Sequence, residues 1–242
     1  DQATVTVKVY AGGIVGGDPI QTLTTTRDGA GAYATSPSSP LGDGTFTAQA
    51  EQEDTAGNTG RSGPVSFSVD TAAPETTIDS GPSDPAGSAE ATFTFSAGQA
   101  GSTFECQLDG GGYSACTSPK SYSGLADGSH TFQVRATDTA GNTDPTPASF
   151  TWSIDTAAPE TTINSGPPDP SGSAAASFSF SSSEPGSAFE CQLDGGGYSA
   201  CTSPRNYSSL ADGSHTFDVR ATDTAGNTDA TPASFTRTEE PV

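Results

Sequence analysis

Apolar and polar residues alternate in short runs along this chain. Apolar residues occupy every second position of 91–95 and of 132–136, with Thr, Gln or Arg between them. Similar alternation marks 104–108 and 148–154. A period of two places successive side chains on opposite faces of a strand, so each run predicts a half-buried β-strand.

These runs belong to a tandem duplication. The motif DTAAPETTI begins at Asp70 and recurs at Asp155, an offset of 85 residues. The same offset relates Cys106 to Cys191, and the two copies align without gaps. Each copy contains about seven such runs separated by turn residues, which is typical of a two-sheet sandwich.

A more distant copy precedes the duplication. LGDGTFT at Leu41 parallels LADGSHTF at Leu125, and DTAGN also occurs in both segments. We therefore expect three domains, 1–70, 71–155 and 156–242, the first of them incomplete at its N-terminal side. The linkers between them contain AAP, which disfavours helix and lacks a full set of backbone donors.

The composition supports an all-β fold. With 29 Gly and 18 Pro in 242 residues, the chain contains too many helix breakers for long helices, whereas short strands joined by turns accommodate them. Only 31% of the residues are hydrophobic, which favours several small cores over one large core.

Three motifs present in both full copies carry a family resemblance: FECQLDGGGYSACTSP, DGSHTF and RATDTAGNTD. In these motifs the chain resembles the bacterial immunoglobulin-like tandem repeats of large extracellular and surface proteins, including adhesin-type stalks. The resemblance implies immunoglobulin-like or fibronectin-III-like β-sandwiches, an extracellular location and no catalytic activity. The first segment resembles a related subtype whose opening strands are missing.

Each full copy contains two cysteines ten positions apart, Cys106 with Cys116 and Cys191 with Cys201. A hairpin that turns symmetrically about Gly111 would place Cys106 and Cys116 directly opposite each other, so we expect a cross-strand disulfide in each copy. An even number of paired cysteines suits an oxidising compartment. A zinc site would need more ligands than two cysteines and one histidine, and the CXXC motif of redox catalysts is absent.

Oxygen ligands recur near the expected domain tips. Asp138, Asn142, Asp144 and Asp155 could supply carboxylate and amide oxygens to Ca²⁺, the one cofactor that the sequence suggests. The same residue types also cap turns without any metal, and their spacing matches no EF-hand loop. Both readings remain open at this stage.

Other chemistries lack their residues. A net charge of −21 makes nucleic acid an unfavourable partner, and no apolar run is long enough to predict insertion into a membrane. His130 and His215 occupy equivalent positions in duplicate domains, where we expect solvated strand ends and no catalytic residues. Trp152 and Ile154 become Arg237 and Glu239 in the last copy, which predicts a more polar final strand there; for the tryptophan we expect core or interdomain packing and no sugar-binding platform.

Three functions are compatible with these observations. The first is a non-enzymatic structural or adhesive stalk segment of a secreted or cell-surface bacterial protein, with neighbouring domains, other copies of itself, or host and surface glycans or proteins as partners. The second is a protomer of an extracellular filament, in which the incomplete first domain receives strands from a neighbour. The third is a carbohydrate-binding accessory module of a secreted hydrolase, which would need an exposed aromatic strip.

Overall fold

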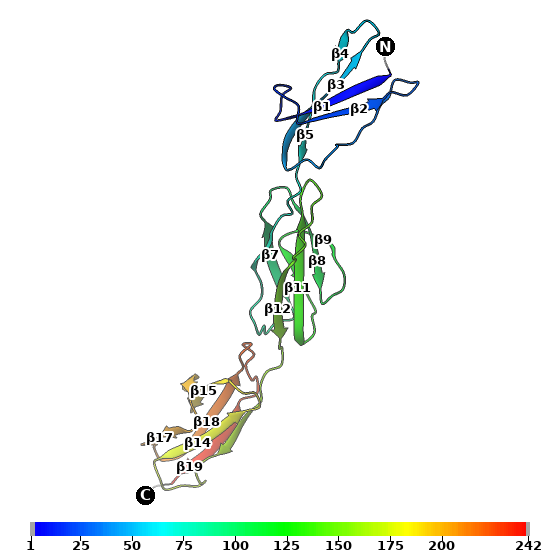
Figure 1. Cartoon of the computed structure of the whole chain (residues 1–242). Coiled ribbons are helices and arrows are strands. Elements are labelled where there is room, and N and C mark those ends of the chain that lie inside the picture. The colour runs from blue at the N-terminus through cyan, green and yellow to red at the C-terminus, as the bar shows by residue number, and fades with distance from the viewer. Residues whose placement is uncertain (1–2, 241–242) are drawn as a thin grey trace. The chain divides into compact units, whose positions relative to one another are not determined.

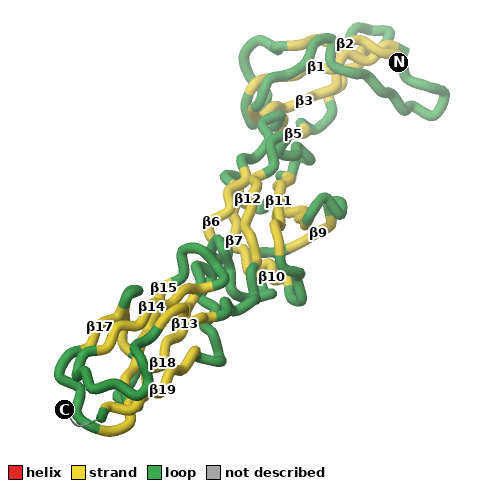
Figure 2. The backbone as a smooth tube through the Cα atoms, turned by 90° about the horizontal axis from the view of Figure 1, so that it is seen from below, coloured by secondary structure: helices red, strands yellow, loops and turns green. Residues whose placement is uncertain are grey.

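The computed structural model describes residues 3–240. The first two residues of the predicted domain 1–70 and the last two of the predicted domain 156–242 lie outside this range. The described residues form strands and loops and no helix, which confirms the all-β class (Figure 2). None of them therefore forms an apolar helix long enough to cross a lipid bilayer. The chain divides into two compact units, and the division passes within 71–155, so the domain boundaries remain predictions.

The described residues of the predicted first domain, 1–70, form a single sheet in which β1 lies beside both β2 and β3 (Figure 1). Both β4 and β5 pair with β3, at opposite ends of that strand. A small core of Val9, Leu23 and Phe46 lies on one face of the sheet. The strands are β1 Thr4–Ala11, β2 Gln21–Thr26, β3 Gly44–Glu53, β4 Thr59–Arg61 and β5 Val65–Val69.

The middle repeat has two sheets, of order β10-β7-β6 and β12-β11-β8-β9. Alternate side chains from both sheets form its core, where Phe93 of β7 stacks on Phe132 of β11 with ring centroids 4.1 Å apart. The strands are β6 Thr76–Ser80, β7 Ala91–Ala97, β8 Thr103–Leu108, β9 Ser114–Cys116, β10 Lys120–Tyr122, β11 Gly128–Thr137 and β12 Ala148–Ile154.

The last repeat has the same arrangement, with sheets β13-β14-β17 and β16-β15-β18-β19. Phe178 stacks on Phe217 with ring centroids 4.3 Å apart, in the same way that Phe93 stacks on Phe132. The strands are β13 Thr161–Ser165, β14 Ala176–Ser182, β15 Ala188–Leu193, β16 Ser199–Cys201, β17 Arg205–Tyr207, β18 Gly213–Thr222 and β19 Ala233–Glu239.

The period-two runs explain this fold. In 91–95 the residues with apolar side chains are buried and the threonines between them are exposed or half-buried. Seven strands per full repeat and two packed antiparallel sheets confirm the predicted immunoglobulin-like sandwich. Fully burying a phenylalanine stabilises a core by about 1.5–3 kcal/mol, which lets two short sheets hold together with few apolar residues.

Candidate functional site

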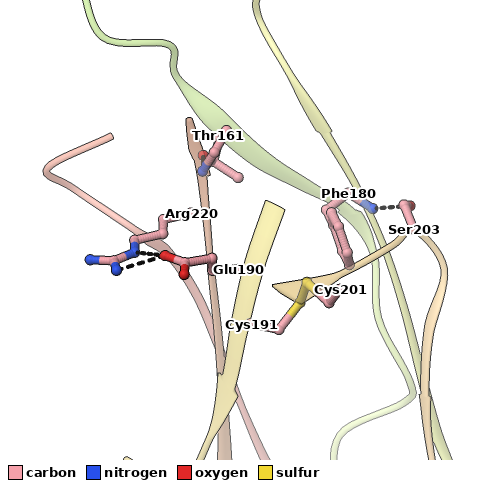
Figure 3. The surroundings of a disulfide bond; sticks show 8 residues. Thr161, Phe180, Glu190, Cys191, Cys201, Ser203 and Arg220 are labelled. Carbon is pink, nitrogen blue, oxygen red and sulfur yellow. Dashed lines mark hydrogen bonds and ion pairs between the residues drawn. A yellow bond between two sulfur atoms is a disulfide. The ribbon is translucent and has the colours of Figure 1, made fainter. Parts of the chain in front are cut away.

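The predicted disulfides are present. Cys106 and Cys116 are bonded with their Cα atoms 5.8 Å apart, and Cys191 and Cys201 repeat this arrangement. Figure 3 shows the second bridge beside Phe180, whose backbone N–H donates a hydrogen bond to the Ser203 hydroxyl, 2.9 Å away. The bridges tie the short strands β9 and β16 to their sheets.

The predicted strand register was wrong in detail. In β15 and β16, Cys191 lies opposite Ser199 and Cys201 lies opposite Phe189, so the two cysteines are diagonal neighbours. The reason is the turn, which is built on Asp194 and Gly195, both with positive φ, and is not centred on Gly196. Two consecutive left-handed residues of type Asp-Gly form the hairpin turn whose twist matches that of the strands.

The turn aspartate also holds a histidine. The Asp109 carboxylate accepts a hydrogen bond from the Thr131 backbone N–H and lies 2.8 Å from Nδ1 of His130, while Nε2 of His130 lies 2.8 Å from the Ala126 carbonyl. Only a protonated imidazole can donate from both nitrogens. The Ala126 and Asp109 acceptors accordingly raise the pKa of His130. Burial alone would raise the pKa of Asp109, but its hydrogen bonds leave it below the usual value.

The same bridge occurs in the last repeat, where His215 contacts Asp194 and the Ala211 carbonyl. The prediction of a solvated strand-end histidine was wrong, because only 12% of the His130 side chain and 14% of that of His215 are exposed. Both ring nitrogens are engaged in each case, so neither histidine presents a free acid or base to a substrate.

The DTAGN motifs form turns in which aspartate is the acceptor. The Asp138 carboxylate accepts hydrogen bonds from the backbone N–H groups of Ala140 and Asn142 and from the Asn142 side chain. These bonds, the Asn142 side chain first, lower the pKa of Asp138. Asn142 Nδ2 also donates to the Asp70 carbonyl at 2.9 Å, which fastens the turn to the linker.

Asp144 is buried, and both oxygens of its carboxylate accept hydrogen bonds. Its Oδ2 accepts from the Thr76 backbone N–H at 3.0 Å, and its Oδ1 accepts from the backbone and hydroxyl of Thr146. Burial opposes ionisation, yet these hydrogen bonds hold the pKa of Asp144 below its usual value. Asp229 of the last repeat has the same environment with Thr161 and Thr231. The turn-capping role therefore accounts for Asp138, Asn142 and Asp144.

Asp155, the fourth predicted ligand, is grouped with two other carboxylates. Oxygens of Asp155, Glu184 and Asp223 lie within 4.8 Å of one another. Burial first, and then the charges of Asp155 and Asp223, raise the pKa of Glu184. In the middle repeat the position of Glu184 is taken by Gln99, whose amide donates to the Ala72 carbonyl at 2.9 Å. That substitution between the copies was the signal from which sequence reasoning could have found Glu184.

The last strand of each full repeat differs in its buried side chains. Trp152 is 1% exposed and packs against Phe93, with the ring centroids 5.1 Å apart, which confirms its predicted core position. The final strand of the last repeat is more polar, as predicted, and its two charged side chains, Arg237 and Glu239, are buried as an ion pair. Arg237 also donates to the carbonyls of Ser173 and Ala175, while its Nε has no hydrogen-bond partner.

Comparisons with known proteins agree with this geometry. Two family models, both described as bacterial Ig-like domains, match residues 1–71 and residues 84–154 with 199–240. No match was found among the curated proteins.

Several solved structures are similar to the chain. The fibronectin(III)-like modules of Clostridium thermocellum CbhA are 18% identical, with a TM-score of 0.44 over 69% of this chain and 95% of that one. A 1.5-MDa bacterial ice-binding adhesin is 17% identical, with a TM-score of 0.42 over 98% and 85%. Domains FN1–FN3 of chicken CNTN1 are 11% identical, with a TM-score of 0.41 over 98% and 90%.

Proposed function

Because the chain belongs to the bacterial Ig-like domains, we propose that it is a non-enzymatic stalk segment of a secreted or cell-surface bacterial protein, acting as a structural spacer or adhesive arm. The observation that carries the proposal is that the cysteine, histidine and turn aspartate side chains bond to other groups of the same chain. The cysteines form disulfides, both histidines are bridged to acceptors, and the aspartates of the repeated turns accept structural hydrogen bonds. Among the described residues, the cysteines and histidines are thereby engaged in contacts that stabilise the fold and are not available as nucleophiles or free bases.

A stalk must also resist sticking to its neighbours. The net charge of −21 keeps copies of the chain apart. Among the described residues, all the exposed large hydrophobic side chains belong to 14–67, so the surfaces of both full repeats lack apolar docking patches. Short strands closed by disulfides also resist local opening in an extracellular environment.

Electron microscopy of the purified chain tests the proposal. We expect isolated beaded particles at all protein concentrations. Ordered fibres that appear as the concentration rises would contradict the spacer role and support the filament function instead. Specific binding to polysaccharide beads would support the carbohydrate-binding function. Of the large hydrophobic side chains that are exposed in the described region, two are aromatic, Tyr33 and Phe67.

The calcium hypothesis enters the proposal at Asp155. Three carboxylates with oxygens within 4.8 Å repel one another, and a divalent cation would relieve that repulsion and stiffen the stalk there. We expect Ca²⁺ to raise the melting temperature of the chain in metal-free buffer, and the variant E184Q, which copies Gln99, to abolish that rise. An unchanged melting temperature on adding chelator or Ca²⁺ would rule the hypothesis out. The variant D138N tests the ligand set that the sequence predicts, Asp138, Asn142, Asp144 and Asp155.

A further inference from the structure

The linker that follows β12 is held by an aspartate of the middle repeat. Asp127, which lies directly before β11, accepts hydrogen bonds from the Thr156 backbone N–H at 3.1 Å and from the Thr156 hydroxyl at 2.9 Å. The first copy has the same contact, in which Asp43 accepts from the backbone N–H of Thr71 at 2.8 Å and from its hydroxyl at 2.7 Å. Each linker is thereby tied to the strands that precede it.

In the middle repeat a histidine holds the loop that contains this aspartate. Nε2 of His130 lies 2.8 Å from the carbonyl oxygen of Ala126, the residue directly before Asp127. Ala126 and Asp127 are both exposed, so burial does little to fix them. The other printed tie of the loop is the backbone N–H of Leu125, which donates to the Ala89 carbonyl at 3.1 Å. The position of Asp127 therefore depends on the hydrogen bond that His130 makes.

That hydrogen bond depends on the protonation of the ring. The imidazolium form of His130 donates from Nδ1 to Asp109 and from Nε2 to Ala126. A neutral ring has one N–H, which the charged Asp109 retains as the stronger acceptor, so Nε2 then turns a lone pair toward the Ala126 carbonyl. The Ala126 carbonyl first, and then the Asp109 carboxylate, raise the pKa of His130. Both hydrogen bonds are accordingly present below about pH 6.5, and one is lost as pH rises through the folded pKa.

The elements packed around this histidine favour its charged form. The turn between β8 and β9 supplies the Asp109 carboxylate, and the histidine's own loop supplies that of Asp127. β12 presents the uncharged ring of Trp152, at 5.5 Å between centroids. β10 presents Tyr122, whose pKa is raised by burial and then by the charge of Asp109, and Lys120, whose ammonium lies over the Tyr122 ring at 5.1 Å. Tyr122 therefore stays neutral while the histidine titrates.

We propose that His130 is a pH-operated latch on the linker between the middle and last repeats. The protonated ring holds Ala126 and so keeps Asp127 in position to bind Thr156. Loss of the proton releases the loop and frees the linker. The latch belongs to the linker and does not depend on what the chain attaches to.

The first copy has the linker contact without the latch. The glycine that begins β3 pairs with the last residue of β5, as the glycine that begins β11 pairs with the last residue of β12. In this common register Phe46 takes the place of His130, and a phenylalanine has no nitrogen to titrate. The hydrogen bond between Thr71 and Asp43 is therefore a control within the same chain.

Amide hydrogen exchange of the full chain, followed by NMR, tests the proposal. We expect the protection factor of the Thr156 amide, corrected for the intrinsic pH dependence of exchange, to fall by about two- to tenfold as pH rises, because its hydrogen bond is weakened. The midpoint of this fall should match the titration of His130 measured from its ring chemical shifts. The protection factor of the Thr71 amide should stay constant.

Three variants locate the latch, and circular dichroism checks the fold of each. H130F, which copies Phe46, should leave Thr156 weakly protected at every pH, and so should D127A, which removes the acceptor. D109N keeps a residue that tolerates the positive φ of 50° at this turn but removes its charge, so the titration of His130 and the fall at Thr156 should move together to lower pH.

Three results would overturn the proposal. The first is a constant protection of Thr156 through the titration of His130. The second is a fall of the same size at Thr71 or in folded H130F. The third is a D109N variant in which the two midpoints separate, and this comparison decides the matter even if H130F does not fold.

Discussion

The buried Arg237–Glu239 pair of the last repeat can be replaced by the residues that the middle repeat uses at the same places. The double variant R237W/E239I copies Trp152 and Ile154 into β19. Trp152 packs against Phe93, Phe150 and His130. The 85-residue offset makes Phe178, Phe235 and His215 the corresponding neighbours, so the side chains that would surround the new tryptophan are already present.

The magnitude follows from the cost of burying charge. Replacing a buried ion pair by well-packed apolar residues is neutral or stabilises a protein by about 1–4 kcal/mol, whereas removing one partner destabilises it by about 3–5 kcal/mol. The unpartnered Nε of Arg237 favours the upper part of the first range. The Ser173 and Ala175 carbonyls that Arg237 now bonds belong to exposed residues and can bond water in its place.

We therefore expect R237W/E239I to raise the free energy of unfolding of the last repeat by about 1–4 kcal/mol, and E239I alone to lower it by about 3–5 kcal/mol. Urea denaturation with calorimetry measures both changes, and the reverse exchange W152R/I154E in the middle repeat provides the matched control. A folded double variant that is less stable than the parent chain, or an E239I variant as stable as the parent, would refute the reasoning.

Three further predictions concern stability. Replacing both cysteines of the Cys106–Cys116 bridge by alanine should cost about 2–3 kcal/mol in urea denaturation, while reducing agent should then have no further effect on that repeat. Because the pKa of His130 is raised, its contribution to stability is complete below its unfolded value of about 6.5 and is lost as pH rises through the folded pKa; H130N should flatten this decline above about pH 6.5. D144A removes the acceptor of the Thr76 N–H and should destabilise the middle repeat by about 1–3 kcal/mol, whereas an unchanged melting temperature would show that this buried carboxylate is dispensable.

The sequence by itself determined the strands, the duplication and the partners of the disulfides. Alternation with period two is a local property of the chain, and the side-chain pattern of 91–95 specifies which face is buried wherever the strand lies. The offset of 85 residues made the two full repeats comparable position by position. The ten-residue spacing of Cys106 and Cys116 placed both in one short hairpin, which specified that they pair but not the register of the hairpin.

Only the tertiary structure decided how polar groups are paired. The diagonal placement of Cys191 and Cys201 depends on the φ angles of Asp194 and Gly195, which the symmetric run of glycines concealed. The engagement of both nitrogens of His130 depends on residues 4 and 21 positions away that approach it from two other segments. Hydrophobic periodicity acts along the chain, whereas a hydrogen bond or a buried ion pair depends on atoms that folding brings together.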